Sequence, residues 1–325
     1  MQLDRREFIR NSATAAAVAA IPASVRAEPA ADMKFIDIHC HCVEESGCPI
    51  GKGLPPLSNP QEMVRFYDEL GVEKGCILPL GTCENFIGGQ SNEEVLRIAK
   101  AHPDRFVPFC NIDPRAGGNS CQARFDEAFA WYREHGCKGI GEICSNIHFL
   151  DPRAQNLFAA AERAGLSVTF HIAAYEGWLY GLVDEPGLPE LEECLKRFPK
   201  LKFFGHSQSF WCEIGEYTTL DERIGYPRGP VKEGAIPRLM RRYPNLYGDL
   251  SAGSGANALM RDREYGIRFL TEFQDRLMFG IDICAPQTHW VKLPQYLREL
   301  VAKGEISETV FRKVGRENAI KLCGL

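Results

Sequence analysis

Short apolar runs alternate with longer, helix-like segments along most of the chain. The apolar runs are rich in β-branched and aromatic residues and are predicted to be buried strands. They span Lys34–His39, Lys74–Leu80, Arg105–Ile112, Cys137–Ile143, Leu166–His171, Leu201–His206, Asn245–Ser251 and Arg276–Asp282. The helix-like segments between them span Asn59–Leu70, Asn92–Ala101, Asp126–His135, Asp151–Ala164, Glu185–Phe198 and Ala235–Tyr243. Regular alternation of strands and helices predicts a parallel sheet covered by helices.

The eight predicted strands favour a closed sheet. We therefore expect an α/β fold, a single-domain (β/α)8 TIM barrel, over residues 34–325. The 243 residues from His39 to Asp282 agree with the roughly 250 of a typical barrel of this kind. A doubly wound open sheet is the alternative, but no glycine-rich dinucleotide-binding motif follows the first strand.

Ionisable side chains gather at the predicted carboxyl ends of the strands. The first strand ends in His39-Cys40-His41, and strand alternation is expected to point both imidazoles into the barrel and Ile36 and Ile38 toward the surrounding helices. The other strand-end residues are Glu142, His171, His206 and Asp282. Because barrel active sites lie at this face, we expect one shared site rather than scattered core histidines.

The remaining histidines and the cysteines receive structural interpretations. His102 and His135 end predicted helices, and His148 and His289 are expected in solvated loops. The 13 cysteines show no paired CxxC spacing, and most lie in apolar runs as small hydrophobic residues. Cysteines flank His41, which leaves a thiolate site as an alternative, but a histidine and carboxylate set is favoured.

The order His-x-His, Glu, His, His, Asp resembles the amidohydrolase superfamily, most closely its amidohydrolase-related branch of metal-dependent hydrolases and decarboxylases. The resemblance extends from Phe35 to the last helix around Asn318. It implies that His206 stands beside the reactive water. It also implies a first metal ion held by His39, His41, His171 and Asp282.

The fourth strand departs from the pattern of many relatives, which carry a carboxylated lysine at its end. Here Lys138 comes too early, and Glu142 takes the position in a Gly-Ile-Gly-Glu-Ile context also found in TatD-like relatives. If Glu142 bridges and His206 coordinates, two metal ions fit. If His206 is free, one ion fits, and we favour one, with His206 acting as acid or base.

Imidazoles and carboxylates suit Zn²⁺ or a similar divalent ion, which lowers the pKa of bound water to about 7. Asp282 or His206 could accept the proton of that water. Serine nucleophile chemistry is disfavoured, because no G-x-S-x-G motif occurs at a strand-to-helix turn.

Aromatic side chains in the loops after the fifth and sixth strands predict a small, flat organic substrate, although loop packing is an equal alternative. Those singled out as substrate-binding are Trp178, Tyr180 and Trp211. Arg115 could bind a substrate carboxylate, or it could cap a helix or face solvent. The segment from Ser207 to Pro244 is expected to cover the mouth and could supply contacts in a homo-oligomer.

Charge and the N-terminus narrow the partners and the location. A net charge of −5 provides no basic field for nucleic acid, and past the N-terminal segment no run approaches the roughly 20 apolar residues of a membrane span. Residues 1–27 combine Arg5-Arg6, an apolar run and a small-residue cleavage site. They predict a twin-arginine signal and a periplasmic or otherwise exported protein, with an amphipathic starter helix as the alternative.

Three functions are compatible with these observations. The first is hydrolysis of a C–O or C–N bond in a lactone, ester or amide by a metal-activated water. The second is non-oxidative decarboxylation of a small cyclic or unsaturated carboxylic acid in the same pocket. The third, a non-catalytic exported binding protein, is least favoured because every expected ligand position is filled.

Overall fold

The structure is a computed structural model that describes residues 32–45, 57–85, 89–286 and 291–325. The predicted export segment, residues 1–27, and His289 lie outside this part of the chain. Within it, no helix combines the length and hydrophobicity that crossing a bilayer requires.

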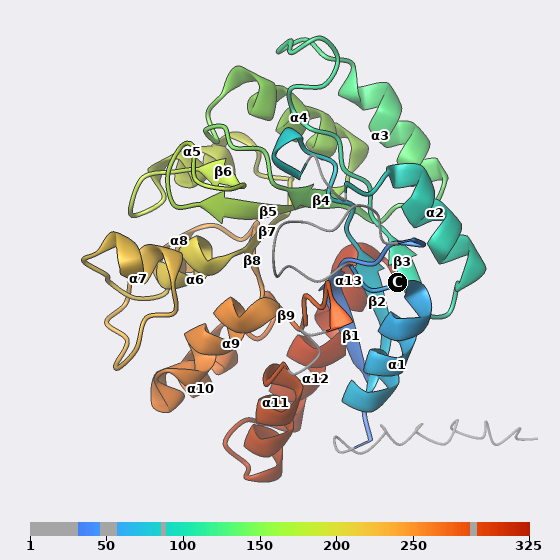
Figure 1. Cartoon of the computed structure of the whole chain (residues 1–325). Coiled ribbons are helices and arrows are strands. Elements are labelled where there is room, and N and C mark those ends of the chain that lie inside the picture. Colours follow the sequence, from blue (N-terminus) through green and yellow to red (C-terminus); the bar gives the residue numbers. More distant parts are fainter. Residues whose placement is uncertain (1–31, 46–56, 86–88, 287–290) are drawn as a thin grey trace, which may run out of the picture.

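Parallel strands form the centre of the molecule (Figure 1). They are β1 (Phe35–Cys40), β2 (Val72–Ile77), β3 (Phe106–Pro108), β4 (Gly139–Ile143), β5 (Ser167–Ala173), β6 (Leu182–Val183), β7 (Phe203–His206), β8 (Leu246–Asp249) and β9 (Leu277–Met278). One sheet has the order β1-β2-β3, and the other has the order β4-β5-β7-β8-β9 with β6 beside β5. Each predicted strand overlaps an observed one.

Backbone hydrogen bonds connect the two sheets at both junctions, although regular strand pairing is interrupted there. Between β3 and β4, Cys110 N donates to Gly139 O at 3.0 Å. Between β1 and the segment after β9, Asp282 N donates to His39 O at 2.9 Å. The connected strands therefore enclose an interior, as a barrel requires.

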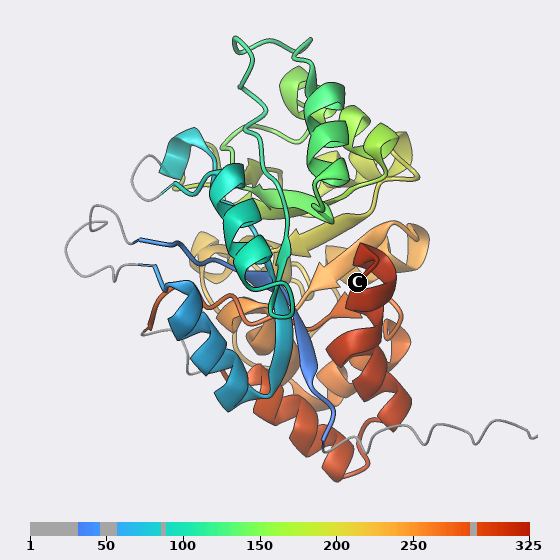
Figure 2. The same ribbon diagram turned by 90° about the vertical axis from the view of Figure 1, so that its right-hand side faces the viewer.

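Helices surround the strands on the outside (Figures 1 and 2). They are α1 (Pro60–Leu70), α2 (Asn92–Ala101), α3 (Phe125–Glu134), α4 (Pro152–Ala164), α5 (Pro189–Arg197), α6 (Gln208–Cys212), α7 (Leu220–Ile224), α8 (Ala235–Arg242), α9 (Ala252–Met260), α10 (Arg263–Glu272), α11 (Leu293–Ala302), α12 (Glu308–Arg312) and α13 (Asn318–Cys323). A 3₁₀ turn (Cys83–Asn85) precedes α2, and a π-helical turn (Lys313–Glu317) joins α12 to α13. The expected helices are all present.

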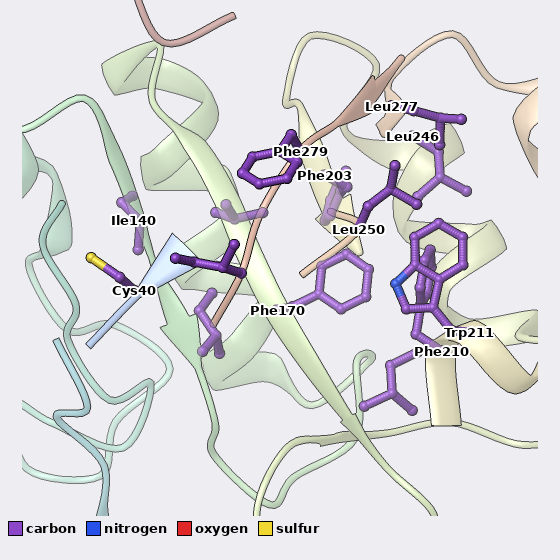
Figure 3. Close-up of a cluster of buried hydrophobic side chains, with 14 of the residues drawn as sticks. Cys40, Ile140, Phe170, Phe203, Phe210, Trp211, Leu246, Leu250, Leu277 and Phe279 are labelled. Carbon is purple, nitrogen blue, oxygen red and sulfur yellow. The ribbon is translucent and has the colours of Figure 1, made fainter. Parts of the chain in front are cut away.

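The larger hydrophobic core lies between the strands and the outer helices (Figure 3). Phe170 and Phe203 contribute to it from β5 and β7, and Phe210 and Trp211 contribute from α6. All four side chains are buried. Burial of this apolar surface is the main force that holds helices against a sheet.

A second, smaller core contains Ile36 and Ile38 together with Phe204 and Met278 of neighbouring strands and residues of α13. The expectation that both isoleucines face the outer helices is therefore wrong. The cause is a register irregularity between Asp37 and Cys40 in the pairing of β1 with β2. It breaks the regular alternation of side chains along β1. As a result, Ile38 packs against Gly280, where an added Cβ would lie 3.2 Å from Ile38 Cγ2.

Candidate metal centre

Two histidines at the end of β1 begin the candidate site. His39 Nε2 and His41 Nε2 are 3.1 Å apart, and both residues are buried. His39 Nδ1 lies 2.6 Å from Asp249 Oδ2, and His41 Nδ1 lies 2.6 Å from Leu78 O. Because each Nδ1 faces an oxygen, Nε2 is the ring nitrogen that each histidine directs into the site.

Glu142 of β4 stands between two pairs of imidazoles. Its Oε2 lies 3.7 Å from His39 Nε2 and 3.5 Å from His41 Nε2. Its Oε1 lies 2.8 Å from His171 Nδ1 and 3.9 Å from His206 Nε2. Each carboxylate oxygen therefore faces a different pair of histidines.

The sheet explains why His171 and His206 meet. β5 and β7 are parallel neighbours whose register places His171 opposite His206. Next to Glu142, Gly141 has a φ of +145°, and a Cβ there would lie 2.7 Å from Thr169 O. Only glycine allows β4 to approach β5 this closely, so the backbone itself brings Glu142 to the histidines.

Asp282 completes the group from the segment after β9. Its Oδ1 lies 3.6 Å from His41 Nε2, and its Oδ2 lies 3.7 Å from His206 Nε2. The side chain is 21% exposed, whereas that of Glu142 is 4% exposed. Asp282 also has a φ of +51°, a conformation that costs energy in a residue with a side chain and is concentrated at functional sites.

Asp249 and Ser251 are supporting residues that the sequence interpretation did not assign to the metal site. Both are fully buried, Asp249 as the last residue of β8 and Ser251 two residues beyond it. Asp249 orients His39, and Ser251 Oγ lies 2.8 Å from His206 Nδ1. The signal was available: like the assigned residues, Asp249 ends a strand.

Charges within the group shift the pKa values of its members. Burial disfavours the charged forms, but the charge of Asp249 raises the pKa of His39 well above its usual value. Despite burial, hydrogen bonds from His171, His39 and His41 lower the pKa of Glu142 well below its usual value. Burial and the nearby charge of His39 lower the pKa of His206 to about 4, which favours its neutral imidazole.

The donor set fits a divalent metal ion. Two ligands of a tetrahedral ion at 2.1 Å are about 3.4 Å apart, close to the separations around His39, His41 and Glu142. Two groups of ligand atoms within mutual reach share Glu142: one with His39 and His41, the other with His171 and His206. The resemblance assigned His171 to the first ion, whereas the structure places it in the second group.

Tyr180 and Trp178, expected to bind substrate, lie beside this centre. The Tyr180 and His171 ring centroids are 4.6 Å apart, and both aromatic residues line a cavity of about 90 Å³ that includes His171. Burial and the charge of Glu142 raise the pKa of Tyr180 well above its usual value, so its phenol keeps its proton.

Trp211 does not line that cavity. It is 2% exposed, its indole N–H donates to Asp249 O at 2.8 Å, and its ring packs against Phe210. The alternative interpretation, loop packing, describes Trp211. Its expected place in the substrate site is wrong, because α6 turns the indole into the core.

Arg115 is already engaged by carboxylates of the protein. Its guanidinium donates to Glu84 at 2.6 and 2.9 Å and to Asp113 at 2.6 and 2.8 Å. Burial opposes ionisation of Asp113, but these bonds lower its pKa well below the usual value. The expectation that Arg115 binds a substrate carboxylate is therefore not supported, because its guanidinium is already paired with Glu84 and Asp113.

The histidines given structural interpretations behave as expected within the described residues. His102 and His135 follow the last residues of α2 and α3, and His135 Nδ1 lies 2.7 Å from Trp131 O. His148 is in the loop after β4, partly exposed and 3.0 Å from Glu190.

These features define a candidate metal-binding site at one face of an α/β barrel. A family model described as Amidohydrolase matches residues 81–325, and the chain belongs to that family. The protein is therefore an enzyme of the amidohydrolase type. No curated protein matches the sequence.

Solved structures with the same fold include a TIM-barrel protein from Bordetella bronchiseptica, with 18% identity over 90% of this chain and 99% of that chain and a TM-score of 0.59. A probable 2-pyrone-4,6-dicarboxylic acid hydrolase from Acinetobacter baumannii has 13% identity over 90% and 100% and a TM-score of 0.54. 5-Carboxyvanillate decarboxylase from Sphingomonas paucimobilis has 16% identity over 90% and 99% and a TM-score of 0.53. The prediction of a barrel of the TIM type is confirmed.

Proposed function

We propose that the protein is a hydrolase that uses divalent metal ions, with Zn²⁺ as the preferred ion, to cleave a C–O or C–N bond of a small organic molecule. The observation that carries this proposal is the placement of Glu142 between two pairs of imidazoles at the end of the barrel. When bound, such ions polarise a substrate oxygen and make water a nucleophile near neutral pH.

The geometry supports two ions, the alternative that the sequence left open. His39, His41 and Asp282 would hold one ion, and His171 and His206 would hold the other, with one oxygen of Glu142 directed to each. In this arrangement His206 is a ligand rather than a free acid or base. We therefore propose two metal ions per chain, in place of the one favoured from the sequence, and metal titration can test this number.

Asp282 is then the residue that handles the proton. It is the most exposed acidic group of the centre, and its Oδ2 lies 3.7 Å from His206 Nε2. A carboxylate in this position accepts a proton from water as the new bond forms and returns it to the leaving group. Asp249 keeps His39 in one orientation while this happens.

Decarboxylation is the second candidate. It is favoured by the decarboxylases among the solved structures of the same fold, including 2,6-dihydroxybenzoate decarboxylase with 13% identity and a TM-score of 0.55. In that reaction the proton held by Asp282 would be delivered to carbon, and CO₂ would leave.

Product analysis tests the two reactions. Protein loaded with Zn²⁺ is incubated with matched panels of lactones, esters and amides and of aromatic and unsaturated carboxylic acids. Release of acid from the first panel supports hydrolysis, whereas CO₂ from the second panel supports decarboxylation. Metal-loaded protein that transforms neither panel, with Asp282→Asn as the inactive reference, would contradict the proposal.

A further inference from the structure

A small cavity adjoins the candidate metal centre on the side of His171. Its volume is about 90 Å³, and its lining includes His171, Trp178, Tyr180, Gln208 and Ser209. A cavity of roughly 150 Å³ is known to hold benzene, so this one accommodates a substituent rather than a second ring.

The backbone fixes one wall of the cavity firmly. Ser207 has a φ of +112°, and its Oγ accepts from Ile172 N and Phe210 N and donates to Ile172 O, each at 3.1 Å. These bonds tie the first turn of α6 to β5. Gln208, the next residue, is therefore held at a fixed place beside His171.

The cavity contains no formal charge of its own. Within the described part of the chain, its lining has no lysine, arginine, aspartate or glutamate. Arg223 precedes the lining residue Ile224, but its guanidinium donates to Asp184 O. An anionic group inside the cavity would lose its hydration with no lysine or arginine of the described lining to replace it, so only a metal ion held by His171 would offset its charge.

Polar groups in the lining are available for a neutral partner. Within the described residues, neither the Gln208 amide nor the Tyr180 hydroxyl has a hydrogen-bond partner. Ser209 Oγ donates to Arg223 O at 3.2 Å, which leaves its lone pairs free to accept. Trp178 and Tyr180 add flat apolar surface to these donors and acceptors.

We infer that this cavity binds an uncharged hydrogen-bonding substituent of the substrate, such as a hydroxyl or carbonyl group, and that Gln208 determines this specificity. The inference rests on the proposed function, because the reacting carboxyl or carbonyl group of the same molecule must lie at the metal centre. It excludes substrates that place a second carboxylate in this cavity.

Binding of matched aromatic acids to Zn²⁺-loaded protein tests the inference. The probes are benzoate, its 3- and 4-hydroxy derivatives, and the corresponding dicarboxylates, measured by calorimetry. The better-placed hydroxybenzoate should bind about 5- to 10-fold more tightly than benzoate, as expected for one added hydrogen bond. The dicarboxylates should bind more weakly than benzoate.

Two variants assign the effect to Gln208. Gln208→Leu should reduce the hydroxyl advantage to less than about twofold and leave the affinity for benzoate unchanged. Gln208→Lys should make a dicarboxylate the preferred probe. The matched control is Gln122→Leu, which removes an exposed glutamine and should behave as the wild type.

The outcomes separate this inference from the proposed function. Protein that retains no metal after loading contradicts the proposed function. Protein that carries metal but binds no probe, or binds dicarboxylates as tightly as hydroxybenzoates, overturns the inference about the cavity. An equal loss of affinity for all probes in Gln208→Leu overturns it as well.

Discussion

Single side chains decide how many metal ions the centre holds. If Glu142 bridges two ions, Glu142→Gln and His206→Asn should each lower the tightly bound metal from two equivalents to one, because each removes ligands of the second group. Titration of Zn²⁺ into apoprotein, with elemental analysis, measures this.

The matched control for that titration is His148→Asn, which changes a partly exposed histidine outside the centre and should keep two equivalents. One equivalent in the wild type, unchanged in His206→Asn, would mean that His206 is a free acid or base. The same variant should then lower kcat by about 10²–10⁴-fold with its metal intact.

Arg115 offers a second test at this scale. Its removal leaves Glu84 and Asp113, 14% and 11% exposed, without their counter-charge. Arg115→Met should therefore lower the free energy of unfolding in urea by about 1–3 kcal/mol. Arg97→Met, which breaks an exposed pair with Glu44, should leave the free energy of unfolding nearly unchanged. A raised KM with unchanged stability would instead restore a role in substrate binding.

The residues of the centre were recognisable from the sequence because they end strands, and strand ends follow from local pattern. The roles of Arg115 and Trp211 were not recognisable from the sequence, because they depend on partners that are distant in the chain. Trp211 is 38 residues from its acceptor in Asp249, and Arg115 is 31 residues from Glu84. No local periodicity specifies such contacts.

At the scale of secondary structure, the approach of β4 to β5 depends on one glycine. Gly141→Ala would place a Cβ 2.7 Å from Thr169 O at a φ of +145°. We expect a loss of about 2–4 kcal/mol in unfolding free energy, with reduced metal content because Glu142 is displaced. Gly165→Ala, where φ is +70° and no atom lies within 4 Å, should cost only about 1–2 kcal/mol. Equal losses in the two variants would show that the contact with β5 is unimportant.

A buried carboxyl group at the start of α5, that of Asp184, should make the stability of the protein depend on pH. Asp184 accepts N–H bonds from Glu185, Glu190 and Leu191, yet its burial raises its pKa to about 7. The folded protein therefore binds more protons than the unfolded chain between about pH 4 and 7, and stability falls as pH rises through that range. The decline attributable to Asp184 is about 4 kcal/mol.

Asp184→Asn should flatten that decline, measured as the melting temperature between pH 4 and 8. Asp104→Asn, a change at an exposed aspartate, should retain the wild-type slope. Identical pH profiles for wild type and Asp184→Asn would show that the carboxyl group is ionised in the fold, held by its three backbone donors.

The main strands and the longer helices as far as α8 were predictable, because buried strands and amphipathic helices leave a regular period in the sequence. The ends of these strands and helices were harder to predict. The strand expected over Arg276–Asp282 is regular only in Leu277–Met278, since Ile281 N then donates to the Asp37 carboxylate instead of to a strand. The short helices α6 and α7 were missed, because five residues are too few to establish a helical period. The longer helices α9, α10 and α11 were not among the helices named from the sequence either.

At the scale of the whole molecule, the predicted export route remains a prediction. A reporter fused behind residues 1–27 should leave the cytoplasm, and Arg5→Lys combined with Arg6→Lys should block it. Fractionation of the cells with immunodetection of the reporter measures this. Transport that continues in the double variant would exclude the twin-arginine route.

The joining of the segment after β9 to β1 also sets an order of events in time. His39 and Asp282 are 243 residues apart, so at a synthesis rate of about 5–20 residues per second the aspartate follows the histidine by roughly 12–50 s. During that interval the nascent barrel lacks its last wall, and a metal ion would find only part of its ligands. Under the proposed assignment, the ion held by His39, His41 and Asp282 would therefore bind late, after synthesis has passed the final strand.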